Sequence, residues 1–245
     1  TAARRKCIAL EGFNMNSSIA TLFATCLASV AILSTNTFAH AQDDHKFIGR
    51  SPDGQVAFEY VGKVKQNDGD FEAYGYFTYI RDLPDEFLFS PDPLDLWKRD
   101  ETNARFLFYS KSQRTRFAQV GKVFNVGVAG TLQIYFRAKA DEATDFAAGD
   151  HFKKGDQICT FALRGQSVIA VTSENVGVNS AAFEVEQQDE WKAFRFTNGG
   201  PLHALGARGA LYRFSHFGRG DRSQAEPPIA TISIAGQATT LGKND

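Results

Sequence analysis

The chain has 245 residues and a formal net charge of −1, and its 22 phenylalanines and 7 tyrosines supply ample material for an apolar core. The near-neutral charge argues against nucleic acid or an anionic membrane as a partner, because phosphate groups are bound through a positive field. A chain of this length can build one core by itself, and all-β barrels and sandwiches often reach this size as one domain.

Residues 1–41 are typical of an upstream segment followed by a signal peptide. Ile19–Leu33 is apolar and uncharged, and Ala39-His40-Ala41 places small residues where signal peptidase cleaves. The run is shorter than the ~20 apolar residues of a membrane span, which disfavours the alternative of an uncleaved anchor. Met15 is the only methionine and the expected translation start. We therefore expect export to the periplasm or the medium, with cleavage after Ala41 and no stable membrane insertion afterwards.

Cleavage there would change the chain's charge and cysteine content. Three basic residues and one acidic residue would be lost, so the net charge would fall from −1 to −3. Cys159 would be the one cysteine left, which excludes an internal disulfide. Cys159 alternates with polar neighbours on an apolar face, so a buried, unreactive thiol is expected.

The first predicted strands form a hairpin. Residues 42–54 are polar and rich in turn formers, and a flexible segment is expected there. A strand is predicted over Gln55–Gln66, where apolar and charged side chains alternate with a period of two. Asn67-Asp68-Gly69 predicts the turn, because these residues tolerate positive φ. Phe71–Arg81 returns as a strand that is apolar or aromatic on both faces.

The middle of the chain predicts a short helix and four strands. Asp92, Pro93 and Asp95 resemble a helix start, and a helical turn through Trp97 is expected. Turns are expected at 111–114 and 121–122, and a bulge or bend near Gly127 and Gly130. The strands are Arg105–Ser110, Arg116–Val120, Val123–Val128 and Thr131–Ala138, the last with Leu132, Ile134 and Phe136 facing inward.

Six more strands are predicted after the charged loop at 139–156. A turn at Gly165-Gln166 separates the first two, and Asn198–Pro201 breaks the chain later. The strands are Gln157–Arg164, Ser167–Thr172, Ala181–Gln187, Trp191–Thr197, Ala210–Phe217 and Ile229–Ile234. Many short strands separated by turns predict an all-β fold. We expect a single antiparallel β-barrel over residues 55–235, alternatively a β-sandwich, with one or two short helical turns and a C-terminal tail at 236–245.

Four phrases of the sequence carry a resemblance. They are YGYFTY at Tyr74–Tyr79, ARFLFYS at Ala104–Ser110, AGTLQIYF at Ala129–Phe136 and FKKGDQICTF at Phe152–Phe161. In these the chain resembles a loose group of exported bacterial all-β proteins that has no assigned activity, over roughly Val56 to Ile234. More distantly, the order of long hairpins is similar to the allene oxide cyclase and dirigent barrels. The resemblance implies architecture alone, and no functional residue follows from it.

No catalytic motif, metal site or cofactor is expected. The histidines after residue 41 are His45, His151, His203 and His216, and none of them forms a paired metal-binding spacing. His203 lies in a glycine-rich loop, where functional residues are common. His216 shares a strand face with Tyr212 and is either a packed side chain or a ligand contact.

Aromatic residues are the next candidates for ligand contact. Tyr76, Trp97 and Trp191 could stack on a sugar or line an apolar pocket. The alternative is that they belong to the core, as most aromatic residues in strands do.

The last candidates lie in a locally basic segment. Arg208, Arg219 and Arg222 flank a strand on which Arg213 and Ser215 share one face. If the barrel has a polar mouth, we expect Arg213 and Ser215 to line it and bind an anionic group. The alternative is that Arg213 is solvated on the outer face.

Three function classes stay open at this stage. The preferred one is a non-catalytic protein that binds a small apolar or anionic ligand or a partner protein. A carbohydrate-binding module is the second, and a cyclase- or isomerase-type enzyme with a barrel pocket is the third. The chain could also be an oligomer.

Overall fold

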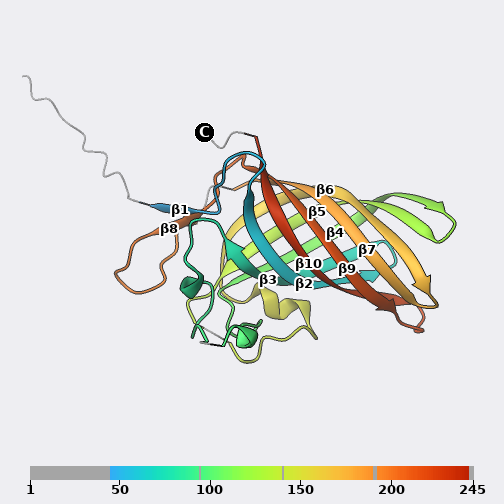
Figure 1. The fold of residues 1–245 in the computed structure, drawn as a ribbon, viewed down its shortest axis with the longest axis horizontal. Coiled ribbons are helices and arrows are strands. Elements are labelled where there is room, and N and C mark those ends of the chain that lie inside the picture. The colour runs from blue at the N-terminus through green and yellow to red at the C-terminus, as the bar shows by residue number, and fades with distance from the viewer. Residues whose placement is uncertain (1–44, 94, 140, 190–191, 243–245) are drawn as a thin grey trace, which may run out of the picture. The chain divides into compact units, whose positions relative to one another are not determined.

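A computed structural model describes residues 45–93, 95–139, 141–189 and 192–242. Eight antiparallel strands close into a barrel in the order β10-β2-β3-β4-β5-β6-β7-β9, and the helical structure consists of short 3-10 turns (Figure 1). The predicted all-β antiparallel barrel with short helical turns is confirmed.

Hairpin connections join the strands in pairs at one end of the barrel, which we call the hairpin end. The strands pair as β2 (Val56–Asn67) with β3 (Asp70–Ile80), β4 (Phe106–Val120) with β5 (Val123–Phe136), β6 (Asp156–Ser173) with β7 (Val176–Gln187), and β9 (Leu211–Arg222) with β10 (Ile229–Leu241). Asp68, Gly121 and Asn175 have positive φ in the first three turns, as tight hairpins require.

Two predicted turns are continuous strand instead. Residues 111–114 lie within β4, where a bulge between Arg114 and Arg116 replaces the expected turn. Gly165 lies within β6, and its Cβ position would be 2.3 Å from the Ala182 carbonyl oxygen. The glycine therefore allows two strands to approach closely and does not turn the chain.

The ends of the described chain also differ from the expected boundaries. β10 runs to Leu241, so most of the expected tail at 236–245 belongs to the barrel. Within the segment 42–54, expected to be flexible, β1 (Lys46–Ile48) pairs in parallel with β8 (His203–Leu205). Residues 192–197 form no strand, although Phe194 bridges to His203 and is buried as expected.

Long connections gather at the opposite end of the barrel, which we call the closed end (Figure 1). They carry the 3-10 turns η1 (Asp85–Phe87), η2 (Leu96–Lys98) and η3 (Gly149–Lys153). η2 is the helical turn predicted near Trp97, and the Asp95 side chain accepts a hydrogen bond from the Trp97 amide at 3.1 Å.

A buried arginine ties these connections together. The Arg137 guanidinium donates to the main-chain carbonyls of Glu101, Thr102 and Ala104 and to the Thr144 hydroxyl. Burial lowers the pKa of Arg137, but its donors are paired with acceptors, which offsets the cost of desolvation.

Aromatic side chains fill the closed end. The inward-facing rings of Phe106 and Phe136 pack against Phe194 and Phe196 from the β7–β8 connection, and the Phe136 and Phe194 centroids are 4.4 Å apart. Phe58, Phe77 and other fully buried rings continue this packing into the barrel. The barrel is therefore solid at this end. In the part of the chain that the structure describes, no helix has the length and apolarity to span a membrane.

Candidate functional site

The hairpin half of the barrel encloses a cavity, which we call the chamber. It has a volume of about 70 Å³, and its wall is mainly apolar, with side chains from all eight barrel strands. The apolar wall includes Val64, Phe71, Val128, Leu132, Leu163 and Ile234. These residues come from strands that alternate inward and outward, so the chamber is a stretch of the barrel axis that side chains do not fill.

A wider cavity adjoins the chamber at the hairpin turns, and we call it the mouth. Its volume is about 470 Å³, within the range of ordinary ligand pockets, and Ile169 and Ile232 line both cavities. Its rim carries two arginines and two aspartates, all exposed, so opposite charges balance there. These residues are Asp68, Arg114, Asp221 and Arg222.

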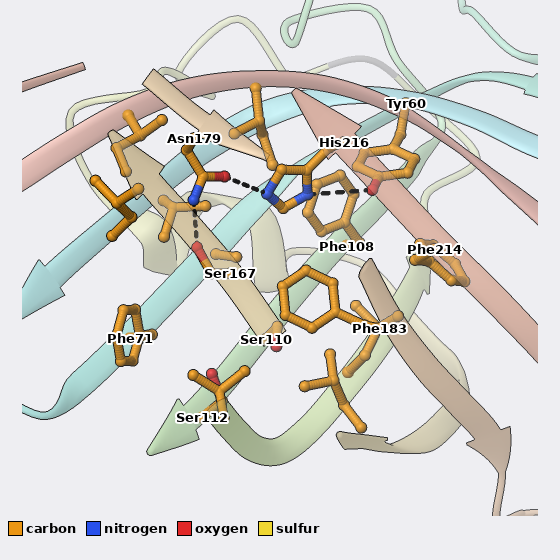
Figure 2. Close-up of a pocket in the computed structure, with 18 residues that line it drawn as sticks. Tyr60, Phe71, Phe108, Ser110, Ser112, Ser167, Asn179, Phe183, Phe214 and His216 are labelled. Atoms are coloured by element: carbon orange, nitrogen blue, oxygen red, sulfur yellow. Dashed lines mark hydrogen bonds between the residues drawn. The ribbon is translucent and has the colours of Figure 1, made fainter. Parts of the chain in front are cut away.

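A chain of polar side chains crosses the chamber wall (Figure 2). The Tyr60 hydroxyl lies 3.3 Å from His216 Nδ1, and His216 Nε2 lies 3.0 Å from Asn179 Oδ1. The Asn179 amide nitrogen then donates to Ser167 Oγ. Four residues from β2, β6, β7 and β9 are thus linked, and we call them the polar chain.

Register explains why these four meet. His216 pairs with Ala181, two residues from Asn179 on β7, and Ala181 in turn pairs with Ser167 on β6. Residues two apart on a strand share a face, so Ser167, Asn179 and His216 all point inward. Tyr60 reaches the same level from β2, on the other side of β10.

Burial keeps the polar chain uncharged. Desolvation lowers the pKa of His216 to about 4 and raises the pKa of Tyr60 above its ordinary value. His216 keeps some accessible surface because it borders the chamber, while Tyr60, Asn179 and the Phe183 ring enclose it. At neutral pH the chamber therefore presents hydrogen-bonding groups without a formal charge.

Of the predicted site residues, His216 lines the chamber and Arg213 and Ser215 do not. The two lie on the opposite face of β9 from Tyr212 and His216, that is, outside the barrel. Arg213 is half-exposed and forms an ion pair with Glu184 at 3.3 Å. It borders a groove on the outer face together with Arg116 and Arg164.

His203 and Tyr76 are also separate from the chamber. His203 packs against Phe194 and Phe196 near the closed end, and its Nδ1 lies 3.1 Å from the Pro201 carbonyl oxygen. Burial lowers its pKa. Tyr76 lies on the outer face of β3 against Phe89, and burial raises its pKa to about 12. His203 packs near the closed end and His216 lines the chamber, so the two histidines do not form one site.

The structure describes one of the two predicted tryptophans, Trp97, but not the other. Trp97 is 96% exposed in η2 of the β3–β4 connection, so it is not a core residue. Trp191 lies outside the described residues, so its prediction as a ligand contact is not placed by the structure.

Three members of the polar chain were not singled out from the sequence. Tyr60 is one of several apolar or aromatic residues that alternate along Gln55–Gln66, and Ser167 and Asn179 belong to no motif. Polar residues at inward positions of otherwise apolar strands could have pointed to this site. Recognising that they lie together, however, requires the register between strands that are distant in the sequence.

Cys159 has the environment that was expected for it. It is buried, and desolvation raises the pKa of its thiol well above the ordinary value. Among the described residues, no group of three or more His, Cys, Asp and Glu side chains could hold a metal ion.

No protein-family model matches the chain, and no curated protein or solved structure is significantly similar to it. The site therefore has to be interpreted from its own geometry.

Proposed function

We propose that this protein binds a small, slender apolar molecule, which enters through the mouth and places one end in the chamber. The observation that carries the proposal is the contrast along the barrel axis. The closed end is packed with aromatic rings, whereas the hairpin half contains an apolar chamber that adjoins a mouth of ligand size.

The sizes of the two cavities constrain the ligand. A chamber of about 70 Å³ is smaller than a ligand pocket and admits only a narrow group, while the mouth of about 470 Å³ accepts the bulk of a small molecule. The rim has balanced charges, so it gives an anion no general advantage over a neutral molecule.

Binding is favoured over catalysis by the state of the polar chain. Both ring nitrogens of His216 have hydrogen-bond partners within the protein, and its low pKa makes it a weak base at neutral pH. Of the residues that the structure describes, no carboxylate or lysine lines the chamber to share in proton transfer.

The test uses two substitutions on adjacent residues of β6. Ile169 lies at the junction of chamber and mouth, and its neighbour Val168 faces outward and is 37% exposed. Ile169→Trp should block the passage and abolish enhanced fluorescence of the apolar dye N-phenylnaphthylamine. Val168→Trp, the matched control, should bind the dye as the wild type does, with one dye per chain.

Melting curves of both variants establish that they are folded at the assay temperature. If folded Ile169→Trp binds the dye as tightly as the wild type, the dye is not held at the passage and the proposed function is contradicted.

A carbohydrate-binding surface at Trp97 is the second candidate. The observation that favours it is the exposure of this ring on a turn held by Asp95 and by the Arg99–Asp92 pair at 2.9 Å. Exposed aromatic faces stack on apolar faces of other molecules. A glycan array in which Trp97→Ala removes any sugar signal tests this candidate.

We also propose that the protein is exported, since the N-terminal sequence combines an apolar run with Ala39-His40-Ala41. N-terminal sequencing of the protein from its producing cells should begin at Gln42 or its cyclised form. A membrane-bound species that retains Met15 would contradict export with cleavage.

A further inference from the structure

The polar chain has a direction. Asn179 donates to Ser167 Oγ through its amide nitrogen, so the Asn179 Oδ1 that faces His216 is an acceptor. His216 must then carry its proton on Nε2, which leaves Nδ1 as an acceptor. The Tyr60 hydroxyl lies 3.3 Å from this Nδ1 and 3.3 Å from the Ser215 carbonyl oxygen, so it has two possible acceptors. From His216 onward each hydrogen bond is donated toward β6, and the last one ends at Ser167.

The hydroxyl group of Ser167 can still donate a hydrogen bond. Its oxygen accepts from Asn179, but among the described residues no acceptor is recorded for its hydroxyl hydrogen. The residue is only 7% exposed and lines the chamber. A buried hydroxyl without an acceptor costs free energy that a ligand's acceptor could recover.

Another serine in the same wall shows the contrast. Ser110 also lines the chamber, but its hydroxyl donates to the Thr131 carbonyl oxygen at 2.8 Å. Its hydrogen is therefore committed within the protein, and Ser110 has no donor to offer a ligand.

We propose that the inner end of the ligand is an uncharged hydrogen-bond acceptor, such as a ketone, aldehyde or ester carbonyl, and that Ser167 donates to it. This inference rests on the proposed function, since it specifies the ligand of the same cavity. A carboxylate is disfavoured because no cationic side chain in the described part of the chain lines the chamber, and an isolated charge in an apolar cavity is costly. The lowered pKa of His216 agrees, since the imidazole stays neutral at physiological pH.

Three probes that share a pentyl tail separate the possibilities. They are methyl pentyl ketone, the alkene in which a methylene group replaces the carbonyl oxygen, and hexanoate. Binding to the wild-type protein is followed by the chemical shifts of the Leu132, Leu163 and Ile169 methyl groups, which line the chamber. Ketone and alkene should both shift these signals, and hexanoate should bind more weakly than the ketone.

The role of Ser167 is tested by a ratio of affinities, because the difference in hydration between ketone and alkene then cancels. The ratio of alkene Kd to ketone Kd should be about three- to tenfold higher in the wild type than in Ser167→Ala, the effect of one neutral hydrogen bond. Ser110→Ala removes the same atom from the same wall and should keep the wild-type ratio.

Infrared spectroscopy gives a readout that needs no variant. The carbonyl stretching band of the ketone bound to the wild type should lie at a lower frequency than in hexane, as expected for a hydrogen-bonded carbonyl. A band at the hexane frequency, an unchanged ratio in Ser167→Ala, or tighter binding of hexanoate would overturn the inference and leave the proposed function standing. If none of the three probes binds, the proposed function itself is overturned.

Discussion

The two halves of the barrel differ in what their inward positions carry. In the closed half these positions hold large rings that are fully buried, among them Phe58, Phe77, Phe106, Phe161 and Tyr212. In the hairpin half, inward positions on the neighbouring strands hold small residues: Ala73, Ser110, Ser112, Gly130 and Gly165. The same strands and the same alternation thus give a solid core at one end and a cavity at the other.

The difference shows that barrel closure alone does not determine whether the axis is filled. An eight-stranded barrel is just wide enough for its inward side chains to fill, so their volumes decide between a core and a pocket. The closed half stabilises the fold, and the hairpin half leaves room for a ligand.

The largest expected effect of a substitution lies in the closed half. Phe136 is 3% exposed and contacts Phe106, Phe194 and Phe196. Phe136→Ala should lower the free energy of unfolding by ~3–5 kcal/mol, because a buried ring is lost and a void remains. Urea denaturation measures this, and a midpoint close to that of the wild type would contradict the packing described here.

Leu163→Ala is the matched substitution in the hairpin half. Leu163 is half-buried and already borders the chamber, so its loss enlarges an existing space. We expect Leu163→Ala to lower the free energy of unfolding by about 2 kcal/mol, near the low end of the range for substitutions of leucine by alanine in protein cores. A cost equal to that of Phe136→Ala would indicate that the hairpin half is as tightly packed as the closed half.

The next prediction is that the stability of the fold depends on pH through His216 in the chamber wall. The pKa of His216 is about 4 in the folded protein, against 6.5 for an unperturbed histidine. As pH falls below 6.5 the unfolded chain takes up a proton at this residue and the folded chain does not, so stability is lost until the pH reaches about 4. Between pH 7 and pH 5 this amounts to roughly 2 kcal/mol.

Comparison with His216→Gln isolates this contribution from those of other groups. The variant should lose about 2 kcal/mol less than the wild type when the pH is lowered from 7 to 5. Tyr60, the titratable side chain in contact with His216, has a raised pKa and stays neutral over this range. In the wild type, the imidazole carbon resonances of His216 should not titrate above pH 5. A titration midpoint near pH 6.5 for the His216 resonances would refute the prediction.

The smallest effect is expected on the outer face. Arg213 is half-exposed and paired with Glu184, and exposed ion pairs contribute about 0–1 kcal/mol. Arg213→Ala should therefore change the melting temperature little and leave ketone binding unchanged. Loss of ligand binding in this variant would indicate that the ligand binds in the outer groove and not in the chamber.

The sequence predicted features that depend on neighbouring residues better than features that depend on residues distant in the chain. Alternation within one strand correctly placed Leu132, Ile134 and Phe136 inside, because side-chain direction has a local period of two. The turn predicted at Gly165 is absent because glycine serves both turns and close strand approach, and the pairing with Phe183 is what distinguishes these.

The candidate site depended on long-range register. The sequence separated His216 from Arg213 by strand face and left two alternatives for Arg213, the lining of a polar mouth or a solvated outer position; the structure has the outer position. The neutral polar groups at Ser167 and Asn179 became visible only when β6, β7 and β9 were aligned. Such pairings between distant residues are not specified by local pattern, whereas burial of one face fixes them in the fold.

The central claim is that an apolar cavity exists in the hairpin half and not in the closed half. Xenon occupies dry apolar cavities, so diffraction from crystals pressurised with xenon tests the claim directly. We predict xenon density in the chamber beside Leu132, Leu163 and Ile234, and none among Phe106, Phe136 and Phe161. An empty chamber, or xenon bound among the rings of the closed half, would contradict the account.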